Sequence, residues 1–338
     1  MDLTVGGEQA QIRDAIRGVL ADRLPLARVR AVVAAPPGFD PDVWREAAAL
    51  GWFGLGLPEA EGGAGYGTPE EMLLALELGR ALAPGPWRGT ILAAHAAPRA
   101  VRAAVLAGAV RVAVVDDPAG ALGAGARLRG TAVDVADAGV AEAFLVLGAR
   151  RAAWVPRDAR GLGVAAAPSI DPTRPLGRLA LDDVGAEPVD ADPAALRRLG
   201  TVLAAAEAAG VAERTLEMSV AYAKVRRQFG RPIGAFQAVK HRCADMAVRA
   251  EVARSVVTFA AVALRDGEGD PARHAAVAKA LATDAALANA ADNVQNHGGI
   301  GYTWEADAHL YLKRAWLLEH EFGRRADHWD ALAAPWRA

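Results

Sequence analysis

Residues 226–237 read RRQFGRPIGAFQ and separate two long stretches of helix-forming sequence. The stretch before this segment, 193–225, and the one after it, 234–266, are rich in alanine and leucine, with charged residues at intervals that leave one face apolar. Gly230 and Pro232 interrupt the pattern, as these residues do at turns. The segment therefore predicts a corner between two helices.

A second glycine-rich segment closes the next helical stretch along the chain. It reads QNHGGIGY over 295–302 and follows a predicted helix at 271–296. Another helical pattern covers 304–334. Four long helices in succession predict a four-helix bundle, which we assign to residues 191–338.

The remainder of the chain divides into a helical part and a β-like part. Residues 8–24, 41–50 and 68–82 carry helical spacing or helix-start signals, so we expect an N-terminal α-helical domain over 1–108. Between 109 and 190 short apolar runs such as VRVAVVDD and AFLVLG alternate with Gly, Pro and Asp, which predicts a middle β domain. The predicted fold class is α+β, mostly α, without the strand–helix alternation of a doubly wound sheet.

Composition excludes several classes of protein. The chain has 338 residues and a net charge of -2, with basic residues scattered among acidic ones, so we expect no nucleic-acid partner. The single cysteine, Cys243, excludes an internal disulfide or a cysteine metal cage. No apolar run approaches the roughly 20 residues that span a bilayer, and the start lacks a signal pattern, so we expect a cytoplasmic protein and no membrane association.

The two glycine-rich segments carry side chains that suit a phosphate-bearing ligand. The Arg226 guanidinium is a planar fork that can pair with a pyrophosphate, and Phe229 offers a flat apolar face. Glutamines supply amide donors and acceptors, and paired glycines at a helix end allow backbone N–H groups to approach a ligand. The candidate cofactor-binding residues are Arg226, Phe229, Gln237, Gln295, Gly298 and Gly299.

Each segment alone is also explained by a helix corner or a helix C-terminal cap, but the two together, in this order, resemble the signatures of the acyl-CoA dehydrogenases. Those signatures are R-x-x-F-G-x-x-(L/I)-x-x-x-Q and Q-x-x-G-G-x-G-(Y/F). The resemblance implies an α lobe, β lobe and α bundle, an FAD cofactor, an acyl-CoA thioester substrate and an electron-transfer acceptor. It also implies a second acyl-CoA dehydrogenase-like subunit in a homo- or hetero-oligomer, because the family binds the ADP part of FAD mainly through the neighbouring subunit.

The catalytic glutamate that this resemblance implies is missing. In many members it precedes a glycine about twenty residues after the second signature, where this chain has Phe322 before Gly323. In others it lies at the start of the first bundle helix, where this chain has Gly200. Glu207 lies two turns further along the same helical face and is a weak candidate base. A buried carboxylate with a salt partner is the competing interpretation of Glu207.

The β-like part departs from the family as well. Where the family usually offers hydroxyl groups to the flavin ring, this chain has Asp116 and Asp117. The motifs directed at a neighbour's FAD are intact, whereas those for the flavin ring and substrate are lost. This pattern, together with residues 301–312, is similar to the heteromeric acyl-CoA dehydrogenases of steroid side-chain degradation, a branch of lipid metabolism. It implies a non-catalytic, FAD-completing subunit; the alternative is a non-redox member, either a flavin-free scaffold subunit or a lyase-like homologue.

Three further expectations concern packing and metals. We expect the oligomer interface to involve residues 234–266 and 304–334, whose helices bear or adjoin the two motifs. His297, His309, His320 and His328 have no second ligand at tight spacing except His320, which lies beside Glu319 and Glu321, so we expect no metal. His297 is expected to cap its helix. Core packing is expected for the large aromatic residues Trp52, Phe53, Trp87 and Trp304.

Overall fold

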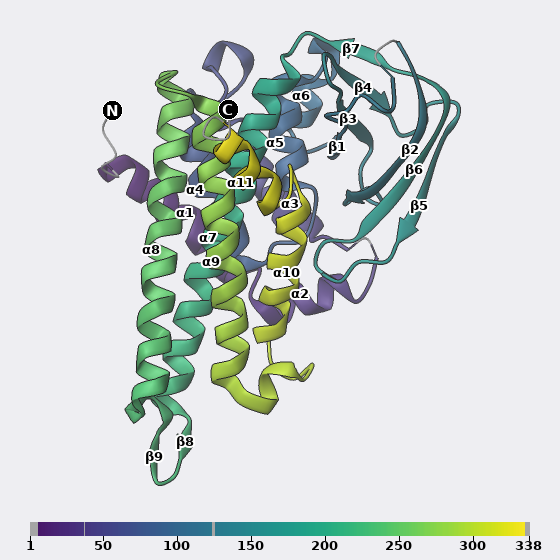
Figure 1. The fold of residues 1–338 in the computed structure, drawn as a ribbon. Helices are drawn as coiled ribbons and strands as arrows, with labels where there is room; N and C mark the ends of the chain where they lie inside the picture. The colour runs from purple at the N-terminus through teal and green to yellow at the C-terminus, as the bar shows by residue number, and fades with distance from the viewer. Residues whose placement is uncertain (1–5, 37, 124–125, 335–338) are drawn as a thin grey trace. The chain divides into compact units, whose positions relative to one another are not determined.

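The computed structural model describes residues 6–36, 38–123 and 126–334, and it is mostly helical with β-strands in the middle of the chain (Figure 1). The predicted fold class is therefore confirmed. The α-helices are α1 (Gly7–Arg23), α2 (Leu26–Val33), α3 (Pro41–Ala49), α4 (Thr68–Ala81), α5 (Trp87–Ala96), α6 (Arg99–Leu106), α7 (Pro193–Val225), α8 (Gln237–Asp266), α9 (Pro271–His297), α10 (Ala308–His320) and α11 (Arg325–Ala333). Short 3-10 helices are η1 (Trp52–Gly54), η2 (Glu59–Glu61), η3 (Ile233–Ala235) and η4 (Gly298–Tyr302).

The middle strands form two sheets. The strands are β1 (Val112–Asp116), β2 (Arg127–Ala136), β3 (Ala143–Leu147), β4 (Ala152–Pro156), β5 (Leu162–Ala167), β6 (Leu176–Gly185) and β7 (Glu187–Val189). One sheet has the order β1-β3-β4-β7, with β1 and β3 parallel, and the other has the antiparallel order β2-β6-β5. Alternate residues of β6 are buried, as expected for a strand with one face on a core.

Within the described residues the chain forms two compact units. The first contains α8 to α11, α7 from Thr201 onward and parts of α1 and α4, over the ranges Met1–Ala21, Met72–Leu82 and Thr201–Ala338. The second contains the two sheets with α2, α3, α5 and α6, over Asp22–Glu71 and Ala83–Gly200. Both candidate motifs, 226–237 and 295–302, therefore belong to the first unit.

Small residues bring α4 and α7 together in the first unit. A Cβ atom added to Gly79 would lie 2.1 Å from the Glu207 carbonyl oxygen, and one added to Gly210 would lie 2.0 Å from that of Leu76. Only glycine permits this close approach of the two backbones. On the next helix, the buried Asn289 donates to the carbonyl of Ala212 on α7 and of Met246 on α8, at 3.1 and 2.9 Å. Side-chain amides therefore fix the packing of α7, α8 and α9.

The helix predicted over 304–334 is divided in two, which corrects the sequence prediction. The chain turns between α10 and α11 at Phe322 and Gly323, which have φ angles of 55° and 91°. Lys279, fully buried on α9, donates to the carbonyls of Glu319 and Gly323 at 3.3 and 3.1 Å. The bond to Glu319 satisfies a carbonyl that the end of α10 leaves without a helical partner, and the bond to Gly323 fixes the turn that follows.

Helices α2, α5 and α6 were not predicted, and the aromatic residues divide between core and surface. Almost every residue of α5 is buried, so no periodic pattern marks it. Core packing is confirmed for Trp52, Phe53 and Trp87 and is wrong for Trp304, which is 62% exposed. No helix of the described residues is long and apolar enough to cross a membrane.

Candidate functional site

The first motif forms a β-hairpin that joins α7 to α8. Strands β8 (Arg227–Gln228) and β9 (Arg231–Pro232) pair in antiparallel fashion through a two-residue turn at Phe229 and Gly230. Both turn residues have positive φ, 51° and 77°, as a tight hairpin of this length requires. Phe229 is 90% exposed, although an aromatic residue is costly in this conformation. An exposed aromatic residue held at this cost indicates a role outside the core.

The second motif ends α9. The ring nitrogen Nδ1 of His297 lies 2.8 Å from the carbonyl oxygen of Asn293, which confirms the predicted cap. Gly298 then leaves the helical conformation with a φ of 67°. A Cβ atom added to Gly298 or Gly299 would meet no atom of the described residues within 4 Å, so no described side chain fills the space beside either backbone. A ligand could therefore approach the backbone closely here.

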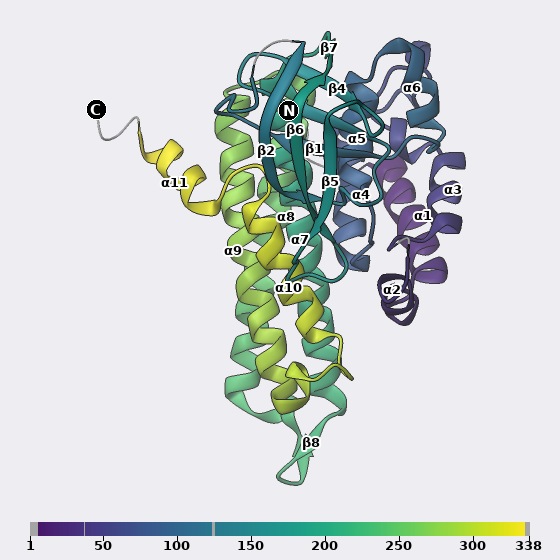
Figure 2. The ribbon, with the colours of Figure 1, turned by 90° about the vertical axis from the view of Figure 1, so that its right-hand side faces the viewer.

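The structure brings the two motifs to the same end of the helical unit. Tyr222, one turn before Arg226, stacks on His297 with ring centroids 4.2 Å apart. Arg242 on α8 donates to Oδ1 of Asn296 at 2.8 Å. These contacts join the ends of α7, α8 and α9 beside the β8–β9 hairpin, which projects beyond the helices (Figures 1 and 2).

The candidate side chains at this end are available for a ligand. Arg226, Gln237 and Gln295 are exposed, and their side chains make no hydrogen bond or ion pair with the described residues. Two other arginines of the motif do contact the chain. Arg227 donates to the carbonyl of Gly230 at 2.9 Å, and the Arg231 guanidinium lies 4.2 Å above the Phe236 ring. Arg227 and Arg231 therefore stabilise the hairpin, whereas the Arg226 guanidinium is available to bind an anion.

Neither position expected for a catalytic carboxylate carries one. Gly200 is buried in α7, and Phe322 lies in the turn after α10. Glu207 is buried, and its Oε1 accepts a hydrogen bond from Nη1 of the fully buried Arg314 at 3.1 Å. The competing interpretation of Glu207, a buried carboxylate with a salt partner, is confirmed, and its role as a base stays a prediction.

Asp116, where the family resemblance implies a hydroxyl group, is engaged in an ion pair. The residue ends β1, and its Oδ1 accepts from Nε of Arg197 at 2.7 Å. Arg197 also donates to the carbonyl of Leu147 at 2.7 Å. Burial raises the pKa of Asp116, although the Arg197 guanidinium opposes that shift. This pair links the start of α7 to the first sheet.

Among the described residues, no three His, Cys, Asp or Glu side chains gather in an arrangement that could hold a metal ion. Another feature was missed in the sequence altogether, a cluster of arginines and glutamates around a cavity in the first unit. Its residues come from four helices far apart in the chain, and no motif marks them.

Family models account for both helical parts of the chain. The model described as acyl-CoA dehydrogenase, N-terminal domain, matches residues 6–104, and the one described as acyl-CoA dehydrogenase, C-terminal domain, matches residues 198–334. The chain belongs to the acyl-CoA dehydrogenase family. The predicted membership of this oxidoreductase family is therefore confirmed.

Individual relatives extend the match over most of the chain. It is 38% identical to the acyl-CoA dehydrogenase IpdE2 of Mycobacterium tuberculosis over 93% of this chain and 92% of that one. It is 39% identical to FadE34 of the same organism, over 93% of this chain but 46% of FadE34. Among solved structures, a variant of the Tcur3481-Tcur3483 steroid ACAD is 29% identical with a TM-score of 0.87, over 98% of both chains.

Proposed function

We propose that this chain is the FAD-completing, non-catalytic subunit of a heteromeric acyl-CoA dehydrogenase that acts on a steroid-derived acyl-CoA thioester. The observation that carries the proposal is an asymmetry between two sets of residues. Arg226, Phe229 and Gln295 are exposed at one end of the helical unit, without ion-pair or hydrogen-bonding partners among the described residues. Gly200 and Phe322, in contrast, leave both family positions of the base without a carboxylate.

The exposed groups fit the ADP part of FAD. Arg226 would pair with the pyrophosphate, Phe229 would cover an aromatic or sugar face, and the amides of Gln237 and Gln295 would bind polar edges. Gly298 and Gly299 would admit the ligand to the backbone, because no atom in the described part of the chain fills the space that a side chain would take. When bound, FAD supplies the oxidant that accepts the substrate's hydride.

The partner subunit would supply what this chain lacks. A dehydrogenase of this kind needs a carboxylate that removes the proton next to the thioester carbonyl, held where burial raises its basicity. It also needs hydroxyl or backbone donors at the flavin ring, where this chain has Asp116 paired with Arg197. An electron-transfer acceptor would then reoxidise the flavin.

Two relatives support a two-part enzyme. The solved steroid ACAD similar to this chain is named for two components, Tcur3481 and Tcur3483. FadE34 is more than twice as long as its match to this chain, which leaves room for a second part of comparable size in the same polypeptide. Both observations are consistent with a division of one active site between two subunits or domains.

Replacement of Arg226 tests this function. We expect Arg226→Ala to lower the FAD content of the co-purified complex, because the pyrophosphate loses a charge-assisted partner. Lys224→Ala is the control, since Lys224 is exposed, basic and two residues away. Equal FAD content in both variants would contradict the proposed role of Arg226.

Activity and colour of the purified chain separate the proposal from its alternative. We expect the chain alone to turn over simple acyl-CoA thioesters negligibly with an artificial acceptor, and the complex with its partner to turn over and show flavin absorption. Robust turnover by the chain alone would disprove the non-catalytic role. A complex without flavin absorption would favour the non-redox alternative, a scaffold subunit or a lyase-like homologue.

A further inference from the structure

One buried carboxylate of the second unit has a histidine as its charged partner. Glu71, in the first turn of α4, has a side chain that is only 1% exposed. Its Oε1 lies 2.7 Å from Nε2 of His95 on α5, and its Oε2 has no hydrogen-bond partner among the described residues. An ionised carboxylate can only accept, so Nε2 of His95 carries the proton and donates it. The burial of Glu71 therefore depends on His95.

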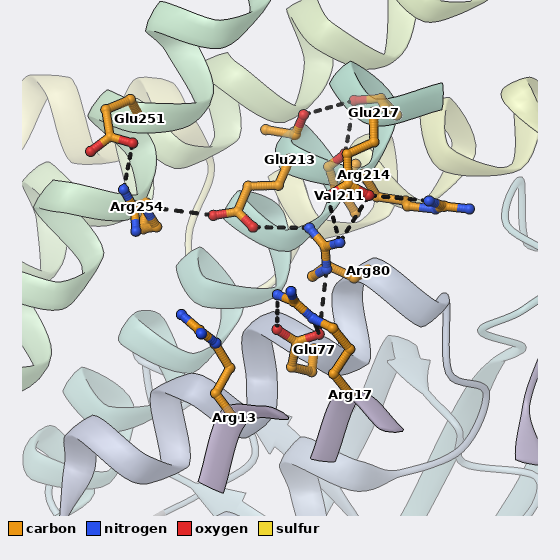
Figure 3. Close-up of polar contacts among 12 residues, drawn as sticks. Arg13, Arg17, Glu77, Arg80, Val211, Glu213, Arg214, Glu217, Glu251 and Arg254 are labelled. Atoms are coloured by element: carbon orange, nitrogen blue, oxygen red, sulfur yellow. Dashed lines mark hydrogen bonds and ion pairs between the residues drawn. The ribbon is translucent and has the colours of Figure 1, made fainter. Parts of the chain in front are cut away.

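This pairing differs from that of a buried glutamate in the first unit. Glu77 binds Arg17 at 2.7 Å and Arg80 at 3.3 Å (Figure 3). A guanidinium keeps its charge over the whole pH range in which proteins stay folded, whereas an imidazole gains or loses its charge between about pH 5 and 8. The ion pairs of Glu77 therefore persist near neutral pH, where the partner of Glu71 can lose its charge.

The other charged groups around His95 are Arg102 on α6 and Glu61 on η2. They bind each other, and Arg102 also donates to the carbonyl of Ala97 at 3.4 Å. Neither group therefore replaces His95 beside Glu71. Burial lowers the pKa of His95, but the attraction of Glu71 and Glu61 outweighs burial, so the pKa lies above its ordinary value of 6.5. The imidazole is charged at mildly acidic pH, and rising pH removes that charge.

The backbone that covers the Glu71 carboxylate belongs to a glycine-rich segment, residues 54–66. A Cβ atom added to Gly56 would lie 2.5 Å from the carboxylate carbon, so the Gly56 backbone lies directly against this group. The segment is folded on itself by hydrogen bonds such as that from the Ala64 N–H group to the carbonyl of Gly54, at 2.9 Å. Five of its thirteen residues are glycine, so its backbone can change conformation at little steric cost. Residues 54–66 can therefore move when the carboxylate requires water.

We propose that His95 is a pH-sensitive latch on residues 54–66. While the imidazole is charged, the Glu71 carboxylate has a cationic partner and the segment stays packed on it. When the imidazole loses its proton, the carboxylate is left buried without that cation, which is costly. Access of water relieves the cost, so the Gly56 backbone moves away and the segment opens locally while the rest of the fold persists. The latch includes no residue of either FAD motif, so it is independent of the proposed function.

Hydrogen–deuterium exchange of the full-length protein, corrected for the intrinsic pH dependence of amide exchange, tests the latch. We expect the protection of residues 54–66 to fall about tenfold between about pH 6 and pH 8.5, the factor that corresponds to one charge-assisted hydrogen bond. Protection of α8 should stay unchanged over the same range. Equal protection of residues 54–66 at both pH values, or higher protection at the alkaline one, would overturn the proposal.

Two substitutions with opposite expected effects separate a latch from a contact that only packs the segment. His95→Gln keeps a donor but carries no charge, so residues 54–66 should be weakly protected at both pH values. Glu71→Gln removes the buried charge that requires a cation, so the same residues should be well protected at both. Protection that is lost in both variants would identify a packing contact, and the proposal would fail.

A double variant and a control complete the test. The double variant His95→Gln with Glu71→Gln pairs two neutral amides and should regain the protection that His95→Gln alone loses. His241→Gln, at an exposed position of α8, should keep the pH dependence of the wild type. A double variant that stays weakly protected, or a pH dependence that persists in His95→Gln, would show that the charge of His95 does not hold the segment.

Discussion

Glu207 illustrates how a single residue can serve two interpretations that sequence alone leaves open. Its position two turns after Gly200 fits a displaced base, and its apolar surroundings fit an internal ion pair equally well. The structure shows the pair with Arg314 on α10, both side chains buried. Removal of one partner from such a pair leaves a charge buried in the core, which is far costlier than the loss of a surface pair.

We therefore predict that Glu207→Gln lowers the free energy of unfolding by about 3 kcal/mol. Urea denaturation monitored by circular dichroism measures the change, and Glu268→Gln, at an exposed turn position, is the control. An unchanged denaturation midpoint would show that the ion pair contributes nothing. Lost turnover of the complex at unchanged stability would return Glu207 to the role of a base.

A second residue pair makes stability depend on pH. His95 on α5 lies 2.7 Å from the buried carboxylate of Glu71 on α4, with Arg102 and Glu61 nearby. Burial lowers the pKa of His95, but the attraction of Glu71 outweighs it, so the pKa lies above the ordinary value of 6.5. The stability due to this pair is complete below the pKa of the unfolded chain and is lost as pH rises through the folded pKa.

The prediction is a stability difference between wild type and His95→Gln that shrinks with rising pH. It should be largest at acidic pH and should decline above about pH 6.5 as the imidazole loses its proton. Urea denaturation of both proteins at several pH values measures it. A difference that is constant, or that grows with pH, would show that His95 does not carry the charge in the folded state.

At the scale of one element, the β8–β9 hairpin combines a strained turn with a proposed ligand contact. We predict that Phe229→Asn keeps or improves stability, because Asn tolerates positive φ better than Phe. The same change should lower the FAD content of the complex, because the aromatic face is lost, whereas Phe229→Tyr should retain FAD. Thermal melts and flavin absorbance measure the two effects. Full FAD content in Phe229→Asn would remove Phe229 from the site.

The sequence predicts helices well where caps and periodicity coincide. For α9 the predicted start at residue 271 is confirmed, because Asp270 accepts hydrogen bonds from the N–H groups of Ala272 and Arg273 and Pro271 opens the helix. The break at Phe322 was missed because it depends on Lys279, some forty residues earlier, which binds the carbonyl of Glu319 before the turn and that of Gly323 within it. Helix α5 was missed because burial on all sides removes the polar face that periodicity requires.

The candidate site, too, was predictable where it depends on contiguous sequence and was missed where it depends on contacts between residues far apart in the chain. Arg226 and Gln295 could be selected because each lies in a contiguous motif, and the structure then shows the stacking of Tyr222 on His297 that joins the motifs. The partner of Glu207 and the cavity near Arg13 depend on tertiary contacts that no local pattern encodes. The domain boundaries predicted near residues 108 and 190 stay a prediction. The two compact units are each discontinuous along the chain, so they do not test a boundary at either residue.

At the scale of the whole molecule, exposed apolar side chains are grouped on the first unit. Val225, Phe229, Tyr302 and Trp304 are exposed around the proposed FAD-binding end. On α8, Val248 and Val252 are exposed one turn apart. Apolar residues grouped in this way mark interaction surfaces, in contrast to single exposed residues. We therefore retain the proposal that 234–266 and 304–334 contribute to the subunit interface.

Substitution of one residue on α8 tests this assembly. We predict that Val248→Arg dissociates the complex and releases FAD while the chain stays folded, because Val248 is 64% exposed in the isolated chain but would face the partner. Val133→Arg on β2 is the matched control, since Val133 is 61% exposed and lies outside the proposed interface. Light scattering after gel filtration measures the mass, and circular dichroism checks the fold.

An obligate interface of roughly 2,000 Å² or more can lose its stability through one charge buried at its apolar centre. Dissociation by Val133→Arg and not by Val248→Arg would move the interface to the β-strands and contradict the cross-subunit role of Arg226.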